Sequence, residues 1–186
     1  MRIIAGSARG LRFDAPEGMD TRPTLDRVKE AMFGMLQFDL PDSTVLDLFS
    51  GSGNLGLEAA SRGAKHVFCN DRNALCAGLI ASNAEKLRLK DTVTVTQLDY
   101  ADCIRRMKAE GYGFDFVFID APYTDGTGEK AAALLLEERL LNPGGRIVLE
   151  HAAALRPDVP SPLADAVKTK KLGKCAYTVF TEKDNV

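Results

Sequence analysis

Residues 44–56, TVLDLFSGSGNLG, combine an apolar run typical of a buried strand with a glycine-rich turn and the start of a helical pattern. Gly51, Gly53 and Gly56 have the G-x-G-x-x-G spacing of a nucleotide-binding loop. Glycine permits positive φ angles and lets a ligand approach the backbone at the carboxyl end of a strand. The stretch therefore predicts a strand, a ligand-binding turn and a helix. A tight turn without a ligand is the structural alternative.

The rest of the chain repeats this alternation of strand and helix patterns. Short apolar runs between longer segments of helical spacing are typical of βαβ units, so the sequence predicts an α/β fold with a mostly parallel sheet. Strands are predicted at 44–49, 65–70, 92–97, 114–120 and 146–150, and a closing antiparallel hairpin at 166–182 with its turn at 172–174. Helices are predicted at 54–63, 72–88, 100–109 and 129–141, the last one stopped by the Asn-Pro-Gly-Gly sequence at 142–145.

The N-terminal segment departs from this pattern. Residues 2–14 predict two short strands around a turn of small residues, and the apolar positions from Leu25 to Leu36 predict a helix. We therefore expect an N-terminal hairpin-and-helix extension, residues 1–40, followed by the main domain, residues 41–186.

The composition is that of a soluble globular protein of ordinary domain size. The chain has 186 residues, of which 45% are hydrophobic and 27% charged. No stretch approaches the ~18 apolar residues of a membrane helix, so we expect no membrane association. With 24 basic and 26 acidic side chains the net charge is -2, and attraction to nucleic acid would have to come from local basic patches.

Cysteine and histidine usage argues against disulfides and metal. The four cysteines form no C-x-x-C pair, and the chain has no charged-then-apolar secretory leader, which predicts reduced thiols and a cytoplasmic location. The two histidines lack metal-ligand spacing to any cysteine, so no metal site is predicted.

A second motif, Phe118-Ile119-Asp120-Ala121-Pro122-Tyr123, ends the fourth predicted strand of the main domain. In a parallel sheet it should open at the same edge as the glycine-rich turn. The Asp120 carboxylate and the Ala121 carbonyl can accept hydrogens of an exocyclic amine, while Tyr123 stacks on a flat base. The alternative is a strand-ending turn in which Asp and Pro serve turn geometry alone.

These motifs resemble those of a known enzyme family. DLFSGSGNLGLEA, FIDAPY and LNPGGRIVLE are similar to the cofactor site, amine-methylating motif and fifth-strand entry of class I methyltransferases. MRIIAGSARGLRF and TRPTLDRVKEAMFGML resemble, more specifically, the bacterial RsmD family, which methylates the exocyclic N2 amine of a guanine in 16S rRNA. The resemblance runs from Met1 to about Glu150. It implies a doubly wound, seven-stranded sheet, S-adenosylmethionine as cofactor and 16S rRNA, within the small ribosomal subunit, as partner; we expect a monomer.

The resemblance also implies roles for individual residues. The loop from Gly51 to Gly53 would cradle the methionine part of the cofactor, with Asp47 near its amino end. The acid that ends the second strand would hold the ribose hydroxyls, and Asp99 would face the adenine unless it is a solvated loop acid. The full set expected at the cofactor is Asp47, Phe49, Ser50, Gly51, Gly53, Asp71 and Asp99. The set expected at the reacting amine is Asp120, Ala121, Pro122 and Tyr123.

The chain departs from the family pattern at two positions. Ala121 stands where the family usually has a second proline, which loosens the turn but keeps the backbone carbonyl. Cys69 stands where the family commonly has Glu, so ribose binding falls to Asp71 or, more weakly, to Asn70.

Basic residues of the extension are the expected RNA contacts, because phosphate binding favours clustered positive charge. They are Arg2, Arg9, Arg12, Arg22 and Arg27. A second basic run at residues 168–174 is interpreted as a solvated edge that protects the C-terminal hairpin, with RNA contact as the alternative.

Other functions remain open at this stage. The same amine pocket suits a methyltransferase of DNA or of a protein amine. A dinucleotide-dependent oxidoreductase is disfavoured because its catalytic pattern is missing. The departures at Cys69 and Ala121 also leave open a non-catalytic RNA-binding or ribosome-assembly factor that retains the fold.

Overall fold

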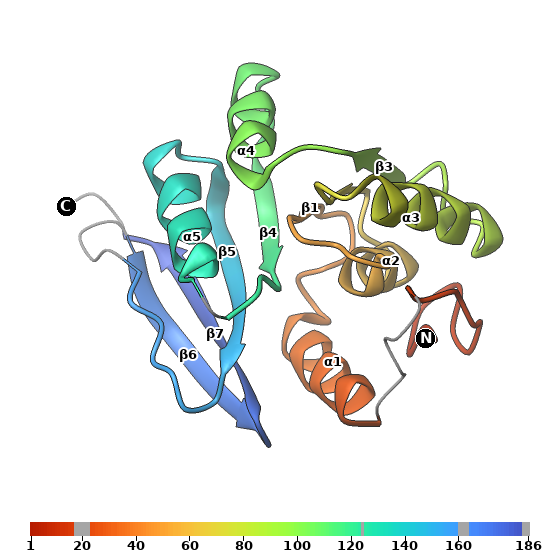
Figure 1. Ribbon diagram of the computed structural model, residues 1–186, viewed down its shortest axis with the longest axis horizontal. Coiled ribbons are helices and arrows are strands. Elements are labelled where there is room, and N and C mark those ends of the chain that lie inside the picture. The colour runs from red at the N-terminus through yellow and green to blue at the C-terminus, as the bar shows by residue number, and fades with distance from the viewer. Residues whose placement is uncertain (17–22, 124, 160–163, 184–186) are drawn as a thin grey trace.

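The computed structural model describes residues 1–16, 23–123, 125–159 and 164–183. Seven strands of these ranges form one sheet in the order β3-β2-β1-β4-β5-β7-β6 (Figure 1). They are β1 (Thr44–Asp47), β2 (His66–Asn70), β3 (Val93–Thr96), β4 (Phe114–Ile119), β5 (Leu141–Ala152), β6 (Ala164–Leu172) and β7 (Cys175–Glu182). β1 to β5 run parallel, and β7 pairs antiparallel with both β5 and β6. The predicted fold class and the predicted closing hairpin are confirmed.

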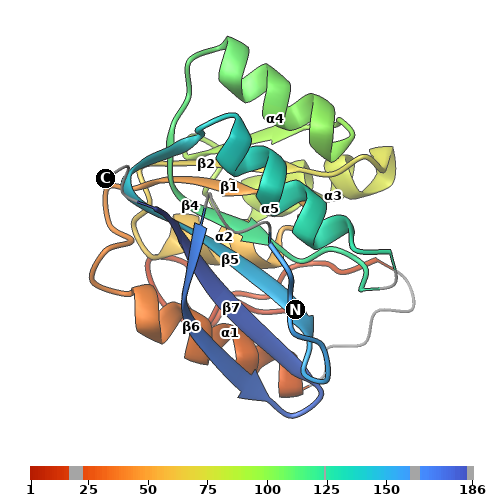
Figure 2. The same ribbon diagram turned by 90° about the vertical axis from the view of Figure 1, so that its left-hand side faces the viewer.

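Helices cover both faces of the sheet. They are α1 (Pro23–Leu36), α2 (Asn54–Ser61), α3 (Ala74–Lys86), α4 (Tyr100–Ala109) and α5 (Thr127–Glu137). The view in Figure 2 places α4 and α5 on one side of the sheet and α1 and α2 on the other. The buried side chains form two clusters accordingly, one shared by α1, α2 and α3 and the other by α4 and α5. This two-sided packing explains why the central strands are nearly continuous apolar runs.

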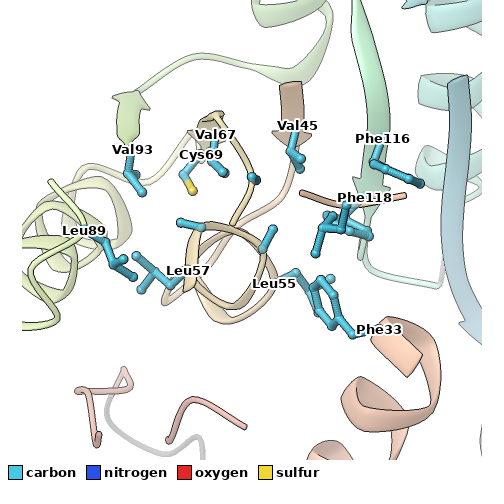
Figure 3. Close-up of a cluster of buried hydrophobic side chains, with 14 of the residues drawn as sticks. Phe33, Val45, Leu55, Leu57, Val67, Cys69, Leu89, Val93, Phe116 and Phe118 are labelled. Atoms are coloured by element: carbon cyan, nitrogen blue, oxygen red, sulfur yellow. The ribbon is translucent and has the colours of Figure 1, made fainter. Parts of the chain in front are cut away.

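The first helix is part of the core rather than an appendage. Phe33 of α1 lies beside Leu55 of α2 and below Phe118 of β4 (Figure 3), in the buried cluster that also contains Leu57 and Val45. The ring centroids of Phe33 and Phe118 are 5.3 Å apart, and both side chains are fully buried. Burial of this apolar surface fixes α1 against the face of the sheet that also carries α2.

The entry into β5 differs from the prediction. α5 ends at Glu137 and β5 begins at Leu141, so the predicted helix end at residue 141 and strand start at residue 146 are wrong. Leu141 pairs with Phe114, and the register shifts before the next pair, Phe116 with Arg146. The proline and glycines between them are accommodated as an irregularity inside the strand, which a turn reading of the same residues misses.

The two short strands expected within residues 2–14 are present only as a single antiparallel bridge between Arg2 and Arg12. The backbone amides of Ile4 and Ala5 donate to the side chain of Glu58 instead, at 2.8 and 3.0 Å. Because these two amides donate to the Glu58 carboxylate, they form no further hydrogen bonds between the two expected strands.

Glu58 of α2 is the centre of a buried ion cluster. Its Oε2 lies 3.1 Å from Lys29 Nζ and its Oε1 lies 2.7 Å from Arg62 Nε, and the Lys29 and Glu58 side chains are almost completely shielded from solvent. Lys29 Nζ also donates to the carbonyl of Arg2 at 2.8 Å and to Oδ1 of Asn54 at 3.0 Å. The cluster therefore joins the N-terminal segment, α1 and α2.

Removing Glu58 should destabilise the protein strongly. Glu58→Ala leaves Lys29 buried without its counter-charge, and we expect the free energy of unfolding to fall by about 3–5 kcal/mol. Chemical denaturation measures it. Glu110→Ala is the matched control, because it breaks the exposed Arg106–Glu110 pair and should cost at most about 0.5 kcal/mol. Equal losses in the two variants would show that the buried cluster contributes no more than a surface pair.

Candidate active site

The glycine-rich turn follows β1 and leads directly into α2. Gly51 and Gly53 have φ angles of 56° and 86°, in the left-handed region that favours glycine. A side chain at Gly53 would collide with Leu57 at 2.8 Å, whereas one at Gly51 would meet no protein atom within 4 Å. Ser50 is buried, and its carbonyl accepts a hydrogen bond from the Gly53 amide at 2.7 Å. The turn is thus built tightly on one side and open at Gly51.

Asp47 lies beneath this turn with one unused oxygen. Its side chain is buried, and Oδ2 accepts the backbone amide of Gly56 at 2.8 Å. Oδ1 has no partner, the one such buried side-chain N or O atom in the described ranges. Burial raises the pKa of Asp47 to about 7, against the lowering effect of the Gly56 amide and the nearby Ser50 hydroxyl. A buried acceptor without a donor is costly, and a cationic ligand group would satisfy it.

Asp71 stands next to the turn, at the end of β2. Its Oδ2 accepts the amide of Gly51 at 2.9 Å, and its Oδ1 accepts the amide of Asn73 at 2.9 Å. Each carboxylate oxygen retains a further lone pair for a ligand hydroxyl. The side chain is therefore available at the loop edge and already oriented by two backbone groups.

The other two residues discussed for ribose binding, Asn70 and Cys69, are buried inside the protein. Asn70 is buried, and its amide nitrogen donates to the carbonyls of Leu48 and Leu98 while its oxygen accepts from Thr96 and the Leu98 amide. Cys69 is fully buried, and a Cβ on Gly56 would lie 2.3 Å from its sulfur. Neither side chain faces the open edge, so Asp71 is the acid that β2 presents there.

Asp99 begins α4, after β3. Its Oδ1 accepts the amide of Ala101 at 3.0 Å, so it caps the helix, a role that sequence reasoning did not assign. The neighbouring Tyr100 ring lies 5.7 Å, centroid to centroid, from Phe49 of the glycine-rich turn. This aromatic contact joins the first and third strand ends, and both rings are partly buried.

The Asp120–Tyr123 turn follows β4, the neighbour of β1. Ala121 is buried, whereas Asp120 is exposed and Tyr123 is 39% exposed. Desolvation by the surrounding protein and the nearby carboxyl of Glu150 raise the pKa of Asp120. The Tyr123 hydroxyl donates to Glu150 Oε1 at 3.0 Å. Glu150 is a contact that sequence reasoning missed, because it reads only as a strand residue of β5.

Three arginines of the extension line a cavity that neither the glycine-rich turn nor the Asp120–Tyr123 turn contributes to. Arg2, Arg9 and Arg27 surround a space of about 450 Å³ together with the acids Asp26 and Glu30. Arg2 is ion-paired with Asp26 at 2.9 Å, with most of its side chain exposed. Arg12 is exposed as well, and Arg22 lies outside the described residues. The lysines at 168, 170, 171 and 174 are exposed on β6 and in the turn after it.

Two further features are missing from the parts of the chain that the structure describes. None of their helices combines the length and the apolar surface needed to cross a bilayer. Nor do three or more His, Cys, Asp or Glu side chains gather there closely enough to hold a metal ion.

Comparison with known proteins defines the family. A family model described as Conserved hypothetical protein 95 matches residues 1–181. Ribosomal RNA small subunit methyltransferase D of Haemophilus influenzae is 35% identical over 181 residues, which are 97% of this chain and 93% of that protein. The chain belongs to the RsmD family. The protein of the same name from Escherichia coli is 29% identical, over 97% of this chain and 89% of that protein.

Solved structures agree with the family assignment. An Escherichia coli structure described as a candidate methyltransferase has a TM-score of 0.86 at 29% identity and covers 98% of each chain. An RNA methyltransferase of Salinibacter ruber in complex with S-adenosyl-L-homocysteine has a TM-score of 0.68 at 17% identity, over 90% of this chain and 96% of that one. The second likeness shows the fold alone.

The buried Asp47 should give the RsmD-family protein a characteristic pH dependence. Its folded pKa of about 7 exceeds the unfolded value of about 4, so between these values the folded state holds a proton that the unfolded chain has lost. Stability should therefore fall as pH rises through this window. We expect the free energy of unfolding, measured relative to Asp47→Asn, to fall by roughly 2–3 kcal/mol between pH 5 and pH 8. If the free energy of unfolding relative to Asp47→Asn stays constant or increases between pH 5 and pH 8, the raised pKa of Asp47 is contradicted.

Proposed function

We infer that the chain is an S-adenosylmethionine-dependent rRNA methyltransferase, and we propose that it methylates the exocyclic N2 amine of a guanine in 16S rRNA of the small ribosomal subunit. The observation that carries the proposal is the meeting of the glycine-rich turn with the Asp120–Tyr123 turn at adjacent strand ends. β1 and β4 pair directly, and the Leu48 amide donates to the Phe118 carbonyl at 3.1 Å. A site for the methyl donor and a site for the accepting amine can therefore share one sheet edge.

The residues at the first strand ends fit the cofactor. The unpartnered Oδ1 of Asp47 suits the ammonium of its methionine part, and the open side of Gly51 leaves room for that part. Asp71 would accept from the ribose hydroxyls and Asp99 from the adenine amine, with Phe49 and Ser50 completing the turn. The cofactor supplies a methyl group activated by a sulfonium.

The Asp120–Tyr123 turn would hold the accepting amine. Asp120 and the Ala121 carbonyl would each accept one amine hydrogen, and Tyr123 would stack on the guanine ring. The amine lone pair is delocalised into the ring, so its alignment with the methyl group matters more than a strong base. The two hydrogen bonds favour a more pyramidal nitrogen and stabilise its growing positive charge. The raised pKa of Asp120 suits it to take the proton that the amine then releases.

The N-terminal extension, residues 1–40, would contact the RNA, and residues 41–186 would carry the chemistry. Three arginines face one cavity of the extension, and such clusters favour phosphate oxygens. The acids Asp26 and Glu30 in the same cavity reduce its net charge, so binding should be selective for a shaped RNA rather than strong for any polyanion.

Methyl transfer tests the proposed reaction directly. We expect labelled methyl from S-adenosylmethionine to appear as N2-methylguanosine in unmethylated small ribosomal subunits. Asp120→Ala should lower kcat at least about 100-fold because it removes an acceptor and proton carrier, with little change in S-adenosylhomocysteine affinity.

Asp102→Ala, in an exposed pair on α4, is the matched control and should retain normal turnover. Near-normal kcat of Asp120→Ala would refute the role of Asp120. Methyl on another atom would refute the guanine assignment, and a wild-type protein that binds no S-adenosylhomocysteine would refute the methyltransferase inference.

Charge reversal tests the RNA contact. Replacing Arg9 and Arg12 by Glu should raise KM for the ribosomal substrate on the order of tenfold at low salt and make binding less salt-dependent, because phosphate contacts are lost. The comparison variant carries Lys170→Glu and Lys171→Glu on β6, and it should change KM less. An equal effect of both pairs would show that the RNA contact is not specific to the extension.

A further inference from the structure

A carboxylate outside the recognised motifs lies against the Asp120–Tyr123 turn. The Tyr123 hydroxyl is 3.0 Å from Oε1 of Glu150 on β5 and 3.9 Å from Sγ of Cys175 on β7. β5 and β7 pair with Ala152 opposite Cys175, and alternate residues of a strand face the same side of the sheet. Glu150 and Cys175 therefore approach the tyrosine hydroxyl from the same face of the sheet.

Stability does not explain this glutamate. Its side chain is partly buried, and no ion pair in the described ranges includes it. A carboxylate withdrawn from water without a cation is unfavourable, and here burial raises the pKa of Glu150. Its negative charge also lies close enough to raise the pKa of Asp120. Burial of Glu150 is therefore unfavourable for the stability of the fold, and its position beside the turn requires a functional explanation.

We propose that Glu150 is a positioning residue: by accepting the Tyr123 hydroxyl, it fixes the aromatic ring against which the substrate base stacks. The inference rests on the proposed function, since it concerns the same amine pocket. Tyr123 is only partly packed, and without an anchor its ring could rotate about its side-chain bonds. A hydrogen bond at the far end of the ring limits that rotation while it leaves a ring face accessible.

A different role for Glu150 would predict different variants. If its negative charge served the reaction by increasing the basicity of Asp120, the charge itself would be essential and the tyrosine hydroxyl would be dispensable. If Glu150 positions Tyr123, the acceptor oxygen is essential and the charge is dispensable. Glutamine separates the two roles because it keeps an acceptor oxygen at the same place but carries no charge.

The experiment compares steady-state kinetics of four variants and one control variant on unmethylated small ribosomal subunits. We expect Glu150→Ala to raise KM for the particle about fivefold to tenfold, with S-adenosylhomocysteine affinity unchanged, because base stacking weakens. Tyr123→Phe should show the same increase, and the double variant should be no worse than either single one. Glu150→Gln should restore most of the loss. Glu182→Ala, at the exposed end of β7, is the matched control.

Three outcomes would overturn the proposal. Glu150→Gln as impaired as Glu150→Ala would assign the effect to charge. Normal KM of Tyr123→Phe together with an impaired Glu150→Ala would separate the two residues. Normal kinetics of Glu150→Ala would remove Glu150 from the site.

A readout without substrate distinguishes failure of this inference from failure of the proposed function. The chain has four tyrosines, so a protein labelled with 3-fluorotyrosine gives few ¹⁹F signals, and Tyr123→Phe identifies the relevant one. We expect the chemical shift of this signal to change in Glu150→Ala, toward an average over several ring orientations. In Glu150→Gln it should remain near its wild-type value. An unchanged signal in Glu150→Ala would overturn the positioning role. The predicted change in a protein that transfers no methyl would support positioning and refute only the reaction.

Discussion

The carboxylate of Glu58 holds the N-terminal extension on the face of the sheet that carries α2. It accepts backbone amides of Ile4 and Ala5 and contacts the cations of Lys29 and Arg62. Taking these charges out of water is costly, and close pairing with several donors offsets that cost. The cluster is therefore stable only when all its partners are present, because loss of one partner leaves the others buried and unsatisfied.

The same cluster reaches the glycine-rich turn. Lys29 Nζ donates to Oδ1 of Asn54, the first residue of α2, and the side-chain amide of Asn83 donates to the carbonyls of both Ser52 and Asp14. The extension proposed to meet RNA is thus bonded to the turn proposed to meet the cofactor. Hydrogen bonds that are buried or partly buried therefore connect the extension to the turn.

Sequence reasoning was successful where a short pattern decides the structure. The apolar runs and the glycine-rich turn gave the parallel strands, and Gly173 marked the hairpin between β6 and β7, because these depend on neighbours along the chain. The early start of β5 was missed because its Asn-Pro-Gly-Gly sequence has the composition of a turn, and only pairing with β4 draws it into the sheet. The contact between Glu150 and Tyr123 was missed because the two residues are 27 positions apart and meet only through the sheet. The choice between Asn70 and Asp71 likewise needed the hydrogen bonds that occupy Asn70.

The unpartnered oxygen of Asp47 also links ligand binding to the release of a proton. At a pH below about 7 the buried carboxyl holds a proton in the free protein. In the role proposed for it, Asp47 would give up that proton when a ligand ammonium takes its place, so the net charge of the carboxyl and its bound cation would stay at zero. Loading of the site is then an ion exchange, and its equilibrium depends on the acidity of the surrounding solution as well as on the ligand concentration.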